Sequence, residues 1–160
     1  MHDKIKETPK NLAPRKEPMY RTEQKEQLTF SDFYLPFGGS LSGKNRWVVI
    51  ASIIPWEKFE SKYAEQFSES GMGAPAKPFR MALGSLIIKE KLDITDEETV
   101  EQIRENPYLQ YFIGMEGYSN DVPFDSSMMV HFRKRISLTM LTDINEQIQQ
   151  EQQKKKSSGR

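Results

Sequence analysis

The chain has 160 residues, contains no cysteine, and balances 23 lysines and arginines against 23 aspartates and glutamates. This length suffices for one folded domain, whereas the composition excludes a disulfide framework, thiolate chemistry and a metal site, because the two histidines, His2 and His131, lie far apart in sequence. The sequence has no signal peptide and no apolar run near the roughly 18 residues of a membrane span, so we expect a soluble intracellular protein. We also expect no cofactor, membrane partner or small-molecule substrate. Because the charges balance, any nucleic-acid binding should rely on local basic clusters.

The first part of the chain predicts an arm followed by an ordered loop. Residues 1–29 are charged, contain three prolines and show no apolar period, so we expect a disordered arm or linker. The next stretch, FSDFYLPFGGSLSGKNRW, is rich in aromatic residues but broken by proline and glycine, which is typical of a loop packed against a core. Its glycines lack the spacing and the preceding strand of a phosphate-binding loop.

Three helices are predicted next. Asn45 can cap a short helix that runs to Ser52, and Pro55 can start a second helix. The aromatic residues of this second helix recur at three and four positions: Trp56, Phe59, Tyr63 and Phe67. Such a stripe is compatible with a platform for stacked bases but is typical of a buried core. Pro78 opens the most hydrophobic helix, FRMALGSLIIKEKL, which should lie at the centre of the fold.

Two shorter helices follow, with clear boundary signals. A capping box, T-x-x-E, begins at Thr95 and opens a helix that should end at about Glu105. Asn106 and Pro107 can start a short helix, YLQYFI, which Gly114 can end. The acids of the capping box are ordinary first-turn residues and do not indicate catalysis.

A final helix is predicted from an apolar stripe that consists of Leu138, Leu141, Ile144 and Ile148. Residues 151–160 are rich in glutamine and lysine and make no further apolar period, so we expect a disordered tail, typical of the junction to a missing catalytic domain. The sequence therefore predicts an all-α fold of six or seven helices and no strand, with residues 30–150 forming the helical domain.

The stretch PFDSSMMVHFRKRI, residues 123–136, combines an apolar and a basic face. Asp125 is suited to cap the N-terminus of a helix, and Phe124 and Met129 have the spacing of a hydrophobic staple. An apolar stripe at i, i+3 and i+7 predicts one buried side. This stripe consists of Met129, Phe132 and Ile136.

Four basic residues surround the stripe: His131, Arg133, Lys134 and Arg135. A helix docked by its apolar side carries such residues in water, as a DNA-reading helix does. A plain surface helix whose cations complement the helix dipole has the same pattern, so both interpretations stay open. The preceding loop is longer than the turn of three or four residues in a compact helix-turn-helix, so the likeness to that motif is loose.

Several segments together resemble the N-terminal domain of bacterial insertion-sequence transposases of the DDE class. In chain order they are FYLPFGG, NRWVVIASIIPWEKFESKYAEQF, GAPAKPFRMALGSLIIKEKL, DEETVEQIRENPYLQYFIGM and PFDSSMMVHFRKRI. The resemblance covers about residues 30–138, and its most specific parts are Glu105–Gly114 and residues 123–136. It implies a helical domain that recognises the terminal inverted repeats of the element as double-stranded DNA, in the bacterial cytoplasm at the nucleoid.

The resemblance also implies that catalysis lies elsewhere. In that family, a downstream RNase H-like domain cuts and joins DNA with metal ions held by two aspartates and a glutamate. This chain stops at Arg160, before the place expected for that domain. Asp121, Asp125 and Asp143 cannot replace the triad, because the family's carboxylates lie on and beside a sheet. We therefore expect no catalytic residue and no bound metal, and a truncated gene product or a degraded insertion element.

The residues expected to contact DNA lie on the basic helix and at the start of the central helix: Arg133, Lys134, Arg135, His131, Ser126, Ser127, Lys77 and Arg80. Arg133 and Lys134 are the main candidates, and Arg135 and His131 come second. The two serines would contact phosphate at the N-terminus of the basic helix. The cations of the central helix oppose its dipole, which favours a position facing the DNA backbone.

Two other functions stay open. The chain could be a multimerisation module, in which the stripe Leu138–Ile148 or the aromatic helix YLQYFI pairs two copies. It could also be an inert remnant that folds without a function of its own.

Overall fold

The computed structural model describes residues 29–65 and 77–158 and contains seven α-helices within these ranges. A short 3-10 helix, η1 (Phe30–Asp32), comes before them. The α-helices are α1 (Arg46–Ile53), α2 (Trp56–Ala64), α3 (Phe79–Leu92), α4 (Asp96–Glu105), α5 (Pro107–Phe112), α6 (Met128–Arg135) and α7 (Leu138–Ser158). The described residues form no strand, only an isolated bridge between Tyr34 and Gly117. The predicted all-α fold is confirmed, while residues 1–28 of the predicted arm and Phe67 lie outside the described residues.

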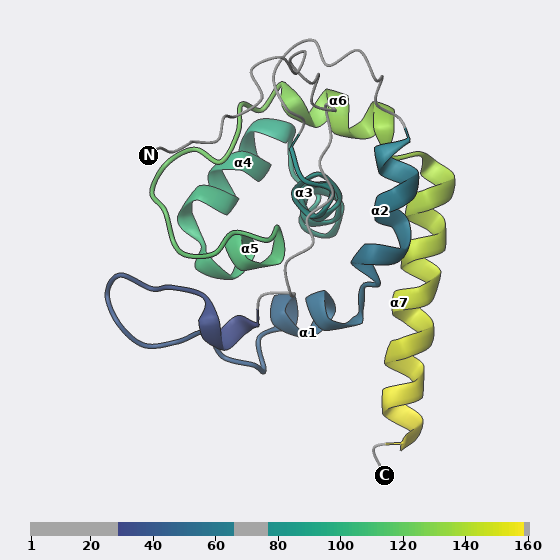
Figure 1. Ribbon diagram of the computed structural model, residues 1–160, viewed down its shortest axis with the longest axis horizontal. Helices are drawn as coiled ribbons and strands as arrows, with labels where there is room; N and C mark the ends of the chain where they lie inside the picture. Colours follow the sequence, from purple (N-terminus) through teal and green to yellow (C-terminus); the bar gives the residue numbers. More distant parts are fainter. Residues whose placement is uncertain (1–28, 66–76, 159–160) are drawn as a thin grey trace, which may run out of the picture.

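Helix α3 is the centre around which the other helices pack. Figure 1 shows it almost end-on, with α4 and α5 on one side, α2 on the other and α6 lying above it. Every residue from Ala82 to Ile88 is buried, as expected for a helix that is apolar around most of its circumference. Gly84 lets α3 approach the end of α5 closely, because a Cβ atom there would lie 3.0 Å from Ile113 Cγ2.

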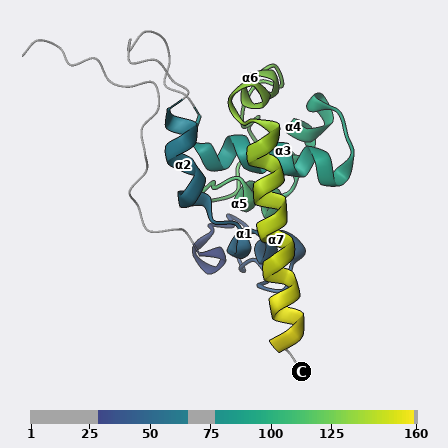
Figure 2. The same ribbon diagram turned by 90° about the vertical axis from the view of Figure 1, so that its right-hand side faces the viewer.

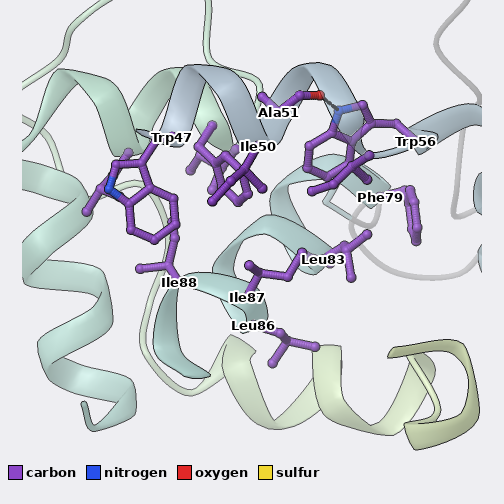
Figure 3. Close-up of a cluster of buried hydrophobic side chains, with 14 of the residues drawn as sticks. Trp47, Ile50, Ala51, Trp56, Phe79, Leu83, Leu86, Ile87 and Ile88 are labelled. Carbon is purple, nitrogen blue, oxygen red and sulfur yellow. Dashed lines mark hydrogen bonds between the residues drawn. The ribbon is translucent and has the colours of Figure 1, made fainter. Parts of the chain in front are cut away.

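Aromatic rings from α1, α2 and α5 pack together, and Figure 3 shows two of them, Trp47 and Trp56, on either side of Ile50. The ring centroid of Phe112 lies 5.1 Å from that of Trp47 and 5.7 Å from that of Trp56. The Trp56 indole N–H donates a 3.0 Å hydrogen bond to the Ala51 carbonyl, so its polar atom is satisfied within the core. Phe59 and Tyr63 are buried as well. The aromatic stripe of α2 is therefore core and presents no platform to bases.

The predicted caps are present at three helices. The Asn45 and Asn106 side-chain oxygens accept hydrogen bonds from Trp47 N–H and Tyr108 N–H at 2.8 and 2.9 Å. Thr95 Oγ1 accepts one at 3.0 Å from the Glu98 N–H. Each contact satisfies a backbone donor that the first turn of a helix leaves free.

Helix α7 differs from its sequence prediction in length and in the phase of its buried face. It continues to Ser158, although residues from 151 on were expected to be disordered. Glutamine, glutamate and lysine favour helix, and extending an anchored helix needs no new nucleation. Its buried residues are Met140, Ile144 and Ile148, whereas Leu138 is 79% exposed. Figure 2 shows α7 running past α1, with its C-terminal turns extending beyond the other helices.

Candidate nucleic-acid interface

The inner face of α6 is fixed against α3. Met129, Phe132 and Ile136 are at most 1% exposed, so the predicted stripe is confirmed. Phe124, which precedes the helix, packs its ring edge-on against Phe132 with centroids 5.2 Å apart. Helix α6 is therefore held rigidly by one side, and its opposite side faces solvent.

A tight turn built on Asp125 leads into α6. Its carboxylate accepts a 2.9 Å hydrogen bond from the Ser127 N–H, and its carbonyl accepts one from the Met128 N–H at 2.8 Å. Hydrogen bonds from the hydroxyl and backbone N–H of Ser127 hold the pKa of the Asp125 carboxyl below its usual value. Ser127 occupies the N-cap position, but its hydroxyl serves Asp125, while Ser126 is half-buried. The Asp125 carboxylate thus lies at the N-terminus of α6, where Ser126 and Ser127 were predicted to contact a DNA phosphate.

The outward residues of α6 include Val130, His131, Arg133 and Lys134, all of them exposed. Arg135 instead is half-buried and lies on the side of α2, where its charge acts on the Tyr63 hydroxyl. Burial raises the pKa of Tyr63 to about 12, and the positive charge of Arg135 opposes this rise. Among the predicted basic residues of α6, His131, Arg133 and Lys134 therefore form the outer face, and Arg135 belongs to its edge.

Arg133 makes a two-pronged ion pair with Asp96, the first residue of α4. Arg133 Nη1 and Nη2 donate to Asp96 Oδ1 and Oδ2 at 2.8 and 3.0 Å. Lys89 Nζ, from α3, lies 3.7 Å from Asp96 Oδ1. Hydrogen bonding from Arg133, with Lys89 as a further cation, holds the pKa of the Asp96 carboxyl below its usual value. The main predicted DNA contact is thus already paired with an acid.

Arg80 does not face solvent as the sequence prediction required. Its Nε and Nη2 atoms donate hydrogen bonds of 3.0 and 2.9 Å to the carbonyls of Phe112 and Tyr111, at the end of α5. The guanidinium carbon also lies 4.7 Å from the ring centroid of Trp56 and 5.1 Å from that of Tyr111. Burial lowers the pKa of the Arg80 guanidinium. Arg80 therefore satisfies helix-end carbonyls in the interior.

The eight predicted DNA-contacting residues do not form one surface. Ser126, Ser127 and the four basic residues belong to α6 and the turn before it, whereas Arg80 is directed to the end of α5. Lys77 lies half-buried just before α3. The outer face of α6 is accordingly the only one of the predicted contact regions that the described residues present as a cluster of exposed cations.

Gln110 positions the loop before α6 and was missed by the sequence reasoning. Its side chain is 1% exposed. Nε2 donates to the carbonyls of Ile103 and Ser119 at 3.0 and 2.9 Å, and Oε1 accepts from the Ser119 N–H at 2.9 Å. The one signal in the sequence was a polar residue inside the apolar run YLQYFI.

No group of His, Asp or Glu residues within residues 29–65 and 77–158 could hold a metal ion. Among the helices of the same ranges, none is both long and apolar enough to cross a membrane. Segment 113–127 separates α5 from α6, so these two helices are not joined by a short helix-turn-helix turn.

Comparison with known proteins places this chain in a family. The family model described as "Transposase domain (DUF772)" matches residues 37–135. The chain belongs to this transposase-domain family. The match ends at the last residue of α6, so it includes the basic helix and excludes α7.

A curated relative supports the same region. The "Uncharacterized protein ORF8 in nfe locus" of Rhizobium meliloti is 38% identical over 89 residues, which is 56% of this chain and 42% of that protein. The chain therefore spans less than half the length of this relative. No solved structure matches.

Proposed function

We propose that this chain is the DNA-end-recognition domain of a transposase of the DDE class, corresponding to its N-terminal part. In this proposal α6 enters the major groove of the terminal inverted repeats during DNA transposition, and the catalytic carboxylates belong to a separate domain. The proposal rests on the two faces of α6. The residues of its inner face are at most 1% exposed, and its outer face carries exposed basic residues. The helix lies inside the region that matches the transposase-domain family.

Phosphate contacts would supply most of the affinity, and base contacts would supply the discrimination. Lys134 and His131 are exposed on the outer face and are suited to phosphate oxygens. Arg133 projects from the same face and carries the planar fork that pairs with guanine in the major groove. Each well-formed base contact would contribute about 1–3 kcal/mol of discrimination.

The aspartates considered as substitutes for the catalytic triad support a non-catalytic role. Asp125 is engaged in the turn before α6, Asp121 lies in the loop before it, and Asp143 lies on α7. A two-metal nuclease site needs carboxylates that converge on ions about 4 Å apart. We therefore propose that the chain itself is not an enzyme.

Several of the residues that suggested a multimerisation module are buried within the chain. Ile144 and Ile148 are 0 and 5% exposed within the chain, and Phe112 of α5 is completely buried. Only Leu138 of the predicted stripe is strongly exposed. Most of the apolar side chains that suggested pairing are therefore used by the chain's own core, which supports DNA recognition over pairing of two copies through these helices.

Substituting a cation of α6 tests the proposal. We expect Lys134→Gln to weaken binding to any duplex several-fold and to lower the salt dependence by about one counterion, as loss of one phosphate contact should. The matched control is Lys44→Gln, an exposed lysine two residues before α1, and Figure 1 shows α1 at the other end of the molecule from α6. Fluorescence anisotropy over a salt series measures both effects. Equal effects of the two substitutions would contradict the role of α6.

A further inference from the structure

The ion pair between Arg133 and Asp96 places a negative charge beside the basic outer face of α6. A carboxylate beside a DNA-binding arginine reduces the positive charge that attracts phosphate. Asp96 is 20% exposed and Arg133 is 42% exposed at their side chains, so the pair lies at the surface. Exposed ion pairs of this kind contribute little to stability. Stability alone is therefore a weak reason for placing Asp96 there.

The pairing leaves part of the guanidinium available. A guanidinium has five N–H groups, and the contacts to Oδ1 and Oδ2 use one from Nη1 and one from Nη2. Three N–H groups remain. Two of them, the Nε–H and the second N–H of Nη2, lie along one edge of the guanidinium plane. This edge is a second two-pronged donor that can bind two acceptors while Asp96 stays in place.

Asp96 is itself held in place by helix α4 and by Lys89 of α3. It is the first residue of α4, whose first turn is capped by Thr95. Lys89 Nζ approaches Asp96 Oδ1 to 3.7 Å and donates a 2.7 Å hydrogen bond to the Ile94 carbonyl. Helix α4 and the end of α3 therefore provide a rigid support for the arginine of α6. Holding a flexible side chain in its bound orientation reduces the conformational cost of binding.

We propose that Asp96 is a positioning residue, which holds the Arg133 guanidinium so that its remaining edge reads a guanine in the major groove. This inference rests on the proposed function, because it assumes that α6 binds DNA. Guanine presents two adjacent acceptors, O6 and N7, that match such a fork. The carboxylate also reduces attraction to phosphate, so the pair favours sequence discrimination over general affinity.

Selection of bound sequences from a pool of random duplexes tests this inference, since such a pool contains every short motif that the chain could prefer. The wild-type chain should select a motif that contains at least one strongly preferred guanine. Asp96→Asn should lose the preference at this position at least several-fold, keep the other positions, and bind random duplex more tightly. Arg133→Lys, which keeps the charge but not the fork, should lose the same position.

Glu97→Gln is the matched control. It removes one exposed carboxylate from the same turn of α4, whereas the contacts to Arg133 come from Asp96. It should keep the wild-type motif. Thermal unfolding of each variant shows whether it is folded, and Arg133→Lys carries the test if Asp96→Asn fails to fold.

The outcomes separate this inference from the proposed function. If Asp96→Asn binds all duplexes more tightly but keeps the motif, Asp96 acts only through its charge and the inference is wrong. If Arg133→Lys weakens all sequences alike, Arg133 contacts phosphate, and the inference is again wrong while DNA recognition stands. If the wild-type chain selects no motif, the proposed function fails, and the inference fails with it.

Discussion

Replacing Arg80 by methionine tests whether Arg80 stabilises the fold, as its hydrogen bonds to the end of α5 indicate, or contacts the DNA backbone, as the sequence alone suggested. Methionine keeps the aliphatic part of the side chain but removes the Arg80 donors from the carbonyls of Phe112 and Tyr111, the second of which keeps the Gly114 N–H at 2.9 Å. A hydrogen bond from a charged donor contributes about 1.5–3 kcal/mol. Two such bonds, partly replaced by water at this half-buried site, give an expected loss of about 3 kcal/mol in the free energy of unfolding.

A loss of this size should lower the melting temperature by about 10 °C in a domain of this length. Thermal and urea unfolding, followed by circular dichroism, would measure it. The matched control is Lys77→Met, a cation removed from the same end of α3, which should change the free energy of unfolding by at most about 0.5 kcal/mol. Unchanged stability of Arg80→Met, together with weaker DNA binding, would refute the structural role and favour a backbone contact.

Two further predictions follow from buried and paired groups. Gln110→Leu should lower the free energy of unfolding by about 2–4 kcal/mol, because it removes the Gln110 partner from the N–H and carbonyl of half-buried Ser119 and from the Ile103 carbonyl, which keeps the Asn106 N–H. Urea unfolding measures this cost, and a change below about 0.5 kcal/mol would contradict it. For Asp96, the pKa is lower in the folded chain than in the unfolded chain, where it is about 3.9. Its contribution is therefore present above this pH and is lost as the pH falls through the folded-state pKa. The stability difference between wild type and Asp96→Asn should shrink below about pH 4, and a difference that stays constant down to pH 2 would contradict the ion pair.

Local signals explain why much of the fold could be predicted. The caps at Asn45, Thr95 and Asn106 depend on residues two or three positions away, so the sequence contains both partners. The apolar period located α3 as the central helix and the buried stripe of α6 correctly. Helix α7 shows the limit of this approach, since residues 151–160 were interpreted from their composition as a disordered tail although the helix continues to Ser158.

The environment of the candidate site depends on tertiary contacts that no local pattern contains. Arg133 pairs with an aspartate 37 residues away, and Arg80 binds carbonyls 31 and 32 residues away. The dipole argument for Arg80 considered only the N-terminus of its own helix. The C-terminal carbonyls of α5, which attract a cation, lie at the same place once the chain is folded. Sequence therefore identified the basic helix but not which of its cations are engaged.

Fluorescence anisotropy of the wild-type chain tests the central proposal most directly. A labelled duplex that carries the inverted repeat flanking the gene would be compared with a scrambled duplex over a salt series. We predict tighter binding to the repeat, with an affinity that falls with salt at a slope of about −0.9 per phosphate contacted. Equally weak binding to both duplexes, or no binding, would contradict recognition of DNA ends by this domain.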